Sequence, residues 1–105
     1  MKIAVAAMGG SLDANVAEQF GRCRWFVVVD PSNQGIEAFL NSASVMAGGA
    51  GPAAVKELVG RGVHVVLAGD FGPKARQAIE AAGLRHGTAS GKVRTAVADW
   101  TKTHA

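Results

Sequence analysis

The stretch GVHVVLAGDFGPKA, residues 62–75, is the part of the sequence most informative about the fold, because it joins an apolar run to the expected start of a helix. Residues 63–69 form a continuous apolar run, which predicts a strand at the centre of a parallel sheet. Pro73 stands where a proline commonly opens a helix. Residues at helical spacing follow until Gly83 ends the pattern: Ala75, Ala78, Ile79 and Ala82. The stretch therefore predicts a strand, a short loop and a helix.

The segments before this stretch predict three more strands and a helix. Residues 2–7 form a short apolar run, and residues 24–30 and 36–41 flank the turn cluster PSNQG and predict a β-hairpin. The irregular residues 11–21 predict a loop or a short helical turn. Residues 42–51 predict a flexible, glycine-rich connection, after which Pro52 opens a helix that runs to about Gly60.

The segments after the stretch predict one more strand and one more helix. Residues 84–87 are the candidate for a short last strand. A helix is expected after Ser90 and Gly91, because four residues repeat its spacing: Val93, Ala96, Val97 and Trp100. The tail TKTHA, residues 101–105, is expected to fray.

This order of elements predicts an α/β fold. Strands that alternate with helices pair in parallel through right-handed crossovers, and the hairpin adds an antiparallel edge. We expect a three-layer sandwich around a five-stranded mixed sheet of order 3-2-1-4-5, in which strand 2 is antiparallel. The 105 residues suit one domain, residues 1–105.

Composition narrows the classes of function. A single cysteine forms no internal disulfide, and the apolar start of the chain is too short for a signal peptide or a membrane span, so we expect a cytoplasmic protein that does not enter a membrane. The net charge is +3, but the basic residues are scattered and tyrosine is absent. A nucleic-acid surface needs a concentrated basic stripe with aromatic residues for stacking, so the charge favours a small anion over a nucleic acid.

Three loops are candidates for binding that anion. In open α/β sheets ligands lie beyond the carboxyl ends of the parallel strands, where we expect residues 8–11, 69–73 and 87–92. The last two lead into helix N-termini, which favour anions, and Lys74, Lys92 and Arg94 add positive charge. Tight turns alone would also explain the glycines of each loop. The common nucleotide-binding motifs GxxxxGK[ST] and GxGxxG are absent.

Cys23 lies between Arg22 and Arg24, and three interpretations remain open. Neighbouring guanidinium groups are expected to lower the pKa of a thiol, which suits a nucleophile or a ligand of a soft metal. A buried cysteine is also a common small apolar residue. The sequence offers no base beside the thiol, because the three histidines, at positions 64, 86 and 104, are dispersed. A closed zinc site is also disfavoured, because one cysteine and three dispersed histidines do not have the spacing of zinc ligands.

Two kinds of enzyme are disfavoured by the residues themselves. The predicted layer order also describes ribonuclease H-like nucleases, whose metal ions need a carboxylate on the first strand, and residues 2–7 have none. Enzymes that use general acid–base catalysis are the second kind, because the chain supplies no evident acid–base pair. We therefore expect a protein that is not an enzyme.

Five motifs in order along the chain resemble the dinitrogenase iron–molybdenum cofactor biosynthesis family. They are MKIAVA at the start, FGR at 20–22, GGAG at 48–51, the stretch at 62–75 and EAAGL at 80–84. The resemblance covers nearly the whole chain and implies a ribonuclease H-like layered fold. It also implies binding of a molybdenum-containing metal–sulfur cluster, of the molybdenum–copper sulfide or the iron–molybdenum type, without covalent attachment, and contact with other proteins of cofactor assembly.

The resemblance also implies where a cluster would lie. Relatives place a histidine before FG and another in the loop that here reads SVMAGGAG, but this chain has Gln19 at the first position and no histidine in the second. A cluster would then be held by Arg22, backbone N–H groups, soft contacts from Cys23, Met8 or Met46, and apolar walls. The predicted binding residues are Met8, Gly9, Gly10, Gln19, Phe20, Arg22, Cys23, Asn41, Gly49, Gly51, Phe71, Gly72 and Lys92, with Cys23 as the candidate metal ligand.

Three hypotheses follow for the function. The first is a non-enzymatic carrier of the anionic cluster. The second is a regulatory module that binds phosphate or a nucleotide, because helix N-termini accept phosphate equally well. The third is an interaction protein that docks through the glycine-rich loop at residues 42–51.

Overall fold

The computed structural model describes residues 1–104, which form one mixed sheet between two layers of helices. The strands are β1 (Lys2–Ala7), β2 (Trp25–Asp30), β3 (Gly35–Leu40), β4 (Val63–Ala68) and β5 (Arg85–Thr88). The helices are α1 (Ala50–Gly60), α2 (Pro73–Ala81) and α3 (Val93–His104), with a short 3-10 helix, η1 (Ser42–Val45). The sheet order is β3-β2-β1-β4-β5. The predicted α/β sandwich and its strand order are confirmed.

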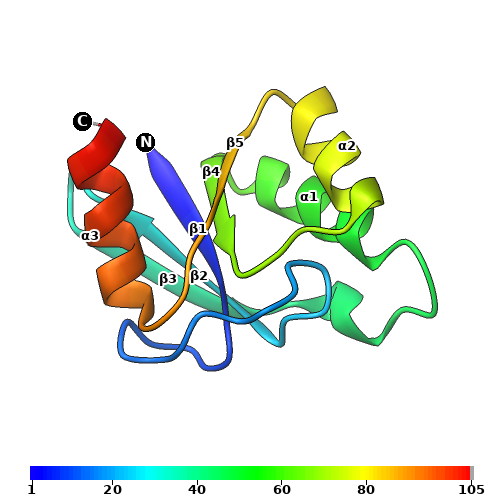
Figure 1. Cartoon of the computed structure of the whole chain (residues 1–105), viewed down its shortest axis with the longest axis horizontal. Coiled ribbons are helices and arrows are strands. Elements are labelled where there is room, and N and C mark those ends of the chain that lie inside the picture. Colours follow the sequence, from blue (N-terminus) through cyan, green and yellow to red (C-terminus); the bar gives the residue numbers. More distant parts are fainter. Residues whose placement is uncertain (105) are drawn as a thin grey trace.

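The pairing of the strands follows from their connections. β2 is antiparallel to both β1 and β3, whereas β4 is parallel to β1 and β5. β1 and β4 are buried along most of their length, which fits their apolar runs and their place at the centre of the sheet. α1 and α2 cover one face of the sheet and α3 covers the other (Figure 1).

Alternate residues of the central strands face the two helical layers. Ala4, Ala6 and Val66 point to α1 and α2, while Ile3 and Val65 point to α3. None of the helices within residues 1–104 is both long and apolar enough to cross a membrane.

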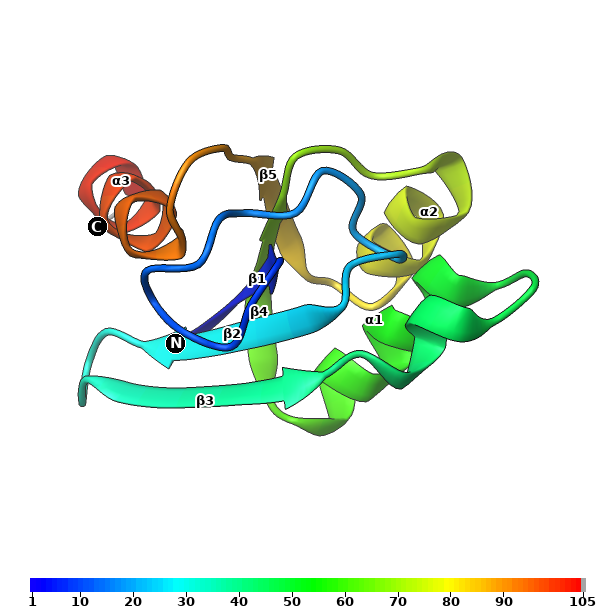
Figure 2. The same cartoon turned by 90° about the horizontal axis from the view of Figure 1, so that it is seen from below.

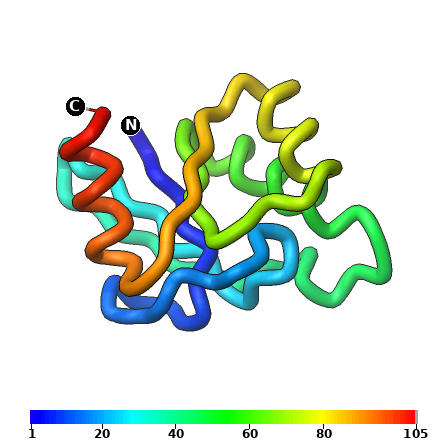
Figure 3. Tube along the Cα trace, viewed as in Figure 1, coloured from blue at the N-terminus to red at the C-terminus, as the bar shows by residue number. Residues whose placement is uncertain are grey.

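The segment at residues 8–22 runs along one end of the sheet (Figure 3). It starts near α3, where the Val16 N–H donates to the Gly91 carbonyl at 2.7 Å. It ends near α2, where the Phe20 N–H donates to the Asp70 carbonyl at 3.1 Å. The predicted loop at residues 11–21 is therefore held at both ends by backbone hydrogen bonds.

Two expectations about the connections were wrong. Residues 42–51 are not a continuous flexible loop, because Asn41 caps η1 and α1 already begins at Ala50. Gly49 initiates α1 with a φ of 73°, a left-handed conformation that glycine adopts without strain. Pro52 is consequently the third residue of the helix rather than its first.

The tail was expected to fray, but α3 continues to His104. The rings of Trp100 and His104 stack with their centroids 3.6 Å apart, and the Thr103 hydroxyl donates to the Asp99 carbonyl at 2.9 Å. These contacts between successive turns extend the helix. The final residue, 105, lies outside the described residues.

Candidate functional site

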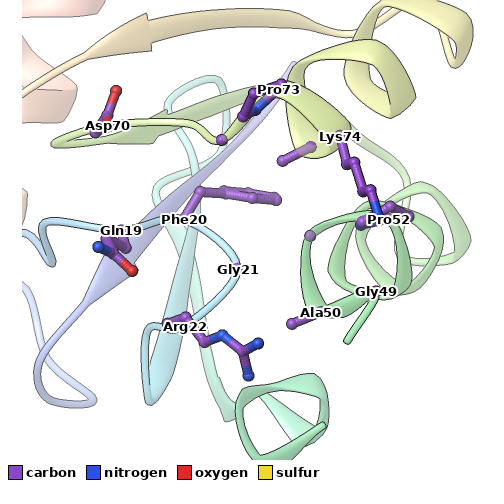
Figure 4. Close-up of a pocket in the computed structure, with 13 residues that line it drawn as sticks. Gln19, Phe20, Gly21, Arg22, Gly49, Ala50, Pro52, Asp70, Pro73 and Lys74 are labelled. Carbon is purple, nitrogen blue, oxygen red and sulfur yellow. The ribbon is translucent and has the colours of Figure 1, made fainter. Parts of the chain in front are cut away.

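A cavity of about 470 Å³ opens beside the carboxyl end of β4, between the starts of α1 and α2 (Figure 4). Three segments from distant parts of the sequence surround it. The lining residues are Gln19, Phe20, Gly21, Arg22, Gly49, Ala50, Gly51, Pro52, Asp70, Gly72, Pro73, Lys74 and Ala75. The cavity lies where open α/β sheets bind ligands, as the sequence predicted for the loop at residues 69–73.

Close approach of the backbone brings the three segments together. A β-carbon on Gly51 would stand 2.7 Å from the β-carbon of Ala75, so glycine is needed for α1 and α2 to meet at their starts. A β-carbon on Gly21 would stand 2.8 Å from the backbone nitrogen of Gly51. Such distances are too short for any larger residue unless the backbone moves.

Phe20 forms the apolar wall of the cavity. Its ring is almost fully buried and packs against Phe71, with 5.3 Å between ring centroids, and against Phe26 at 5.4 Å. Phe71, the other predicted wall, does not line the cavity but supports Phe20 from behind. Backbone pairing of Gln19 with Asp70 fixes the position of this wall.

The two helix starts supply hydrogen-bond donors. The first intrahelical bonds run from the Ala53 N–H to Gly49 and from the Arg76 N–H to Gly72, which leaves the amides of the preceding turn without a helical partner. Within residues 1–104 no side chain caps either helix, and neither first turn carries an acidic residue. Both starts thus present N–H groups and a positive dipole end to the same cavity.

Two cationic side chains lie at the cavity. Arg22 reaches from the loop at residues 19–22 toward η1, and Lys74 extends from α2 toward the start of α1 (Figure 4). The Arg22 guanidinium donates through Nη1 to the carbonyl oxygens of Met46 and, at 3.4 Å, of Ser44. Arg22 therefore contributes charge to the cavity and also holds the chain that follows η1.

Asn41 was predicted to bind the ligand, but the structure places it behind the cavity. Its side-chain oxygen accepts from the Ala43 N–H at 3.1 Å, and its Nδ2 donates to the carbonyl oxygens of Gly21 at 3.2 Å and Cys23 at 2.9 Å. The side chain is buried and joins the loop at residues 21–23 to η1. Its contacts make Asn41 a positioning residue.

Cys23 lies in the core below α1 and does not line the cavity. The prediction that the two arginines lower the pKa of the thiol was wrong, because burial raises it from 9.0 to about 12. The Asn41 amide, 3.7 Å from the sulfur, offsets that effect only in part. The thiol occupies the position of a small buried apolar residue and is poorly suited to be a nucleophile or a thiolate ligand at neutral pH.

Four other predicted residues lie away from the cavity, around the start of α3: Met8, Gly9, Gly10 and Lys92. The Met8 N–H donates to Asn15 at 2.9 Å, and Asn15 pairs with Lys92. A β-carbon on Gly10 would stand 2.8 Å from the ring of Trp25, which packs against the α3 face of the core. Of the three predicted loops, only the one at residues 69–73 lines the cavity, and no residue of 8–11 or 87–92 does.

The structure brings six of the predicted binding residues together in the cavity wall, namely Gln19, Phe20, Arg22, Gly49, Gly51 and Gly72. Four lining residues were not predicted at all, namely Gly21, Ala50, Pro52 and Ala75, while Asp70 and Pro73 belong to the predicted loop at residues 69–73 but were not listed as binding residues. Lys74 was expected to add charge near this loop, and the cavity includes it. The motif FGR contained a signal for Gly21, since a glycine between two site residues suggests close backbone approach.

The side chains that commonly bind metal ions do not gather in the part of the chain that the structure describes. Within residues 1–104 no three of the His, Cys, Asp and Glu side chains lie together as a metal-binding group. The cavity instead offers backbone N–H groups, one guanidinium and one ammonium, which are donors for an anion, and Asp70 is the one acidic residue among its lining residues.

Comparison with solved structures supports the fold and identifies relatives. The apo form of the orange protein from Desulfovibrio gigas is 39% identical, with a TM-score of 0.93, over 97% of this chain and 88% of that one. A NifB-like protein of the DUF35 family from Thermotoga is 27% identical, with a TM-score of 0.83, over 96% of this chain and 87% of that one. The protein PH0822 shares the fold at 21% identity and a TM-score of 0.83, over 98% and 92% of the two chains.

No curated protein sequence matches this chain. A family model, however, matches almost its whole length. The model described as dinitrogenase iron-molybdenum cofactor matches residues 1–103. Together with the likeness to the orange protein, this match shows that the chain belongs to the dinitrogenase iron–molybdenum cofactor family.

Proposed function

We propose that the cavity between α1 and α2 binds a molybdenum-containing metal–sulfur cluster as cargo and that the protein is a non-enzymatic carrier. The observation that carries the proposal is the convergence of two uncapped helix starts, Arg22 and Lys74 on one cavity. Family membership supplies the chemical class of the ligand. The ligand is of the molybdenum–copper sulfide or iron–molybdenum type.

The donors of the cavity fit such a cargo through its outer atoms. A cluster of this kind carries several negative charges, and its sulfides accept hydrogen bonds from N–H groups and from cationic side chains. The amides of Ala50, Gly51, Lys74 and Ala75 belong to the two helix starts that line the cavity. Phe20 adds an apolar wall against which polarisable sulfides pack. The cargo is therefore held without a covalent bond to the protein.

Reconstitution of the purified apo-protein with tetrathiomolybdate and a copper(II) salt tests the proposal. We expect a chromophore that elutes with the protein during gel filtration. A chromophore found only in the small-molecule fraction would contradict the proposal. Lys74→Met should retain less chromophore than Lys56→Met, a matched change on the exposed side of α1.

Phosphate is the competing ligand, because it uses the same amide donors. Calorimetric titration of the apo-protein with inorganic phosphate and with nucleotides separates the two functions. Submillimolar binding of a nucleotide, together with failure to retain the chromophore, would favour the regulatory module.

Contact with other proteins of cofactor assembly is a further part of the carrier proposal.

A further inference from the structure

The β3 strand forms one edge of the sheet and leaves apolar side chains uncovered. It pairs with β2 without interruption from Trp25↔Leu40 to Asp30↔Gly35, and within residues 1–104 no segment lies along its other side (Figure 2). Ile36 and Leu40 are 55% and 57% exposed, on the sheet face that carries α3. Sheet edges in monomeric proteins are commonly protected by proline, lysine or a bulge, and β3 has none of these.

The hydrogen bonds of β3 show which of its residues direct their N–H and C=O groups toward β2 and which direct them out of the sheet. The Asn41 N–H, directly after β3, donates to the Arg24 carbonyl at 2.9 Å and so points toward β2. In an antiparallel pair the direction alternates with each residue. The N–H and C=O groups of Phe39 and Glu37 therefore point toward β2, whereas those of Ile36, Ala38 and Leu40 point out of the sheet.

We propose that a second copy of this chain pairs with the edge of β3, antiparallel and about a two-fold axis through Ala38. In this register Ala38 faces Ala38 of the second copy, and Ile36 faces Leu40 of the second copy. The outward N–H and C=O groups at positions 36, 38 and 40 are then the groups that form the ladder between the two copies. The exposed apolar side chains cover one another on the α3 face.

The opposite face of the same edge carries charged side chains of both signs. The guanidinium carbon of Arg61 lies 3.5 Å from the centroid of the Phe39 ring, and its Nη1 lies 2.9 Å from Glu37 Oε2. In the proposed register Phe39 faces Glu37 of the second copy. Each Arg61, whose Nε also donates to Glu57 Oε2 at 3.2 Å, is thus placed between its own Glu37 and the Glu37 of the second copy. The side chain of Glu37 is 51% exposed and free to receive this second guanidinium.

The assembly leaves both cavities open. β3 is parallel to β1 because two antiparallel pairings, β1 with β2 and β2 with β3, separate them, and β4 pairs with β1 in parallel. Antiparallel pairing of the two β3 strands therefore places the cavities at opposite ends of one continuous sheet. The dimer binds two ligands at separate sites, and its formation does not depend on the proposed cargo.

Sedimentation velocity of the apo-protein over a wide concentration range tests the dimer. We expect a species of twice the chain mass of 10.7 kDa. Ile36→Lys and Ala38→Pro should each raise its dissociation constant at least tenfold, by adding a charge at the edge or by removing an outward N–H. Neither change removes a hydrogen bond between β2 and β3. Val45→Lys, at a residue 89% exposed on η1, is the matched control and should dimerise as the wild type does.

Disulfide trapping tests the register. Facing residues of a hydrogen-bonded antiparallel pair have Cα atoms about 5.5 Å apart, within the range that a disulfide spans. Mild oxidation should link two chains of Ala38→Cys but not of Leu40→Cys, whose symmetry-related positions are far apart. The native Cys23 is buried and does not compete. A monomer at every concentration, a dimer insensitive to Ile36→Lys and Ala38→Pro, or linkage through position 40 would each overturn the proposal.

Discussion

Gly51 at the start of α1 and Ala75 at the start of α2 lie so close that a β-carbon on Gly51 would stand 2.7 Å from that of Ala75. We predict that Gly51→Ala lowers the free energy of unfolding by about 1–3 kcal/mol, because the helix starts must separate to admit the methyl group. Urea denaturation measures the change. Gly48→Ala is the control, since a β-carbon there meets no atom within 4 Å. Equal stability of the two variants would show that the close approach of the two helix starts does not exclude a methyl group at position 51.

Asn41→Ala removes the link between η1 and the loop at residues 21–23. We predict a loss of about 2–3 kcal/mol of stability, because the buried carbonyls of Gly21 and Cys23 lose a donor and the Ala43 N–H loses its cap. Thermal denaturation followed by circular dichroism checks this prediction. Asn33→Ala, which also removes a side-chain acceptor but at an exposed turn, should cost less than about 1 kcal/mol. A smaller effect at Asn41 than at Asn33 would refute the positioning role.

The raised pKa of Cys23 predicts a dependence of stability on alkaline pH. The folded thiol has a pKa of about 12 against 9.0 when exposed, so its contribution is complete below pH 9.0 and is lost as the pH rises toward 12. Urea denaturation at stepped pH should show a steeper alkaline loss for the wild type than for Cys23→Ala. Parallel curves for the two proteins would contradict the burial of the thiol.

Arg22 should matter more than Cys23 for retention of the proposed cargo. We predict that Arg22→Ala weakens retention about tenfold or more, since a charge-assisted hydrogen bond contributes about 1.5–3 kcal/mol. Arg24→Ala removes the same charge from an exposed residue outside the cavity and should have little effect. The fraction of chromophore that remains after dialysis measures retention, and added salt should lower it.

The reverse result would change the interpretation of the site. Cys23→Ser keeps the volume nearly unchanged and leaves Arg22 in place, so the cargo should survive. Loss of the chromophore in Cys23→Ser, with retention in Arg22→Ala, would make the thiolate a metal ligand.

The strand order was predictable because few connections satisfy the rules for parallel strands. The apolar run at residues 63–68 predicted a central strand, and the helices before and after it in the sequence predicted right-handed crossover connections. The short hairpin then fixed β2 and β3 at one edge. These rules depend on local sequence patterns alone.

The surroundings of Cys23 were not predictable from its neighbours. The turn that precedes β2 directs Cys23 into the core, where its carbonyl oxygen accepts from the Asn41 side chain, while Arg22 and Arg24 stay exposed. Met8 does not line the cavity, and the loop to which its N–H donates through Asn15 pairs instead with Lys92, which is distant in the sequence. Residues adjacent in the sequence were therefore a poor guide to residues adjacent in the site.

The use of backbone amides at the two helix starts affects how the cavity tolerates mutation. A side-chain substitution at Ala50 or Lys74 leaves the N–H group of that residue in place, and only proline deletes it. The proposed anion binding is therefore expected to resist most single substitutions, whereas the preferred anion is expected to depend on the replaceable side chains at the rim, Gln19 and Arg22. For the proposed site, we therefore expect substitutions at positions 19 and 22 to change which anion is preferred before they abolish anion binding.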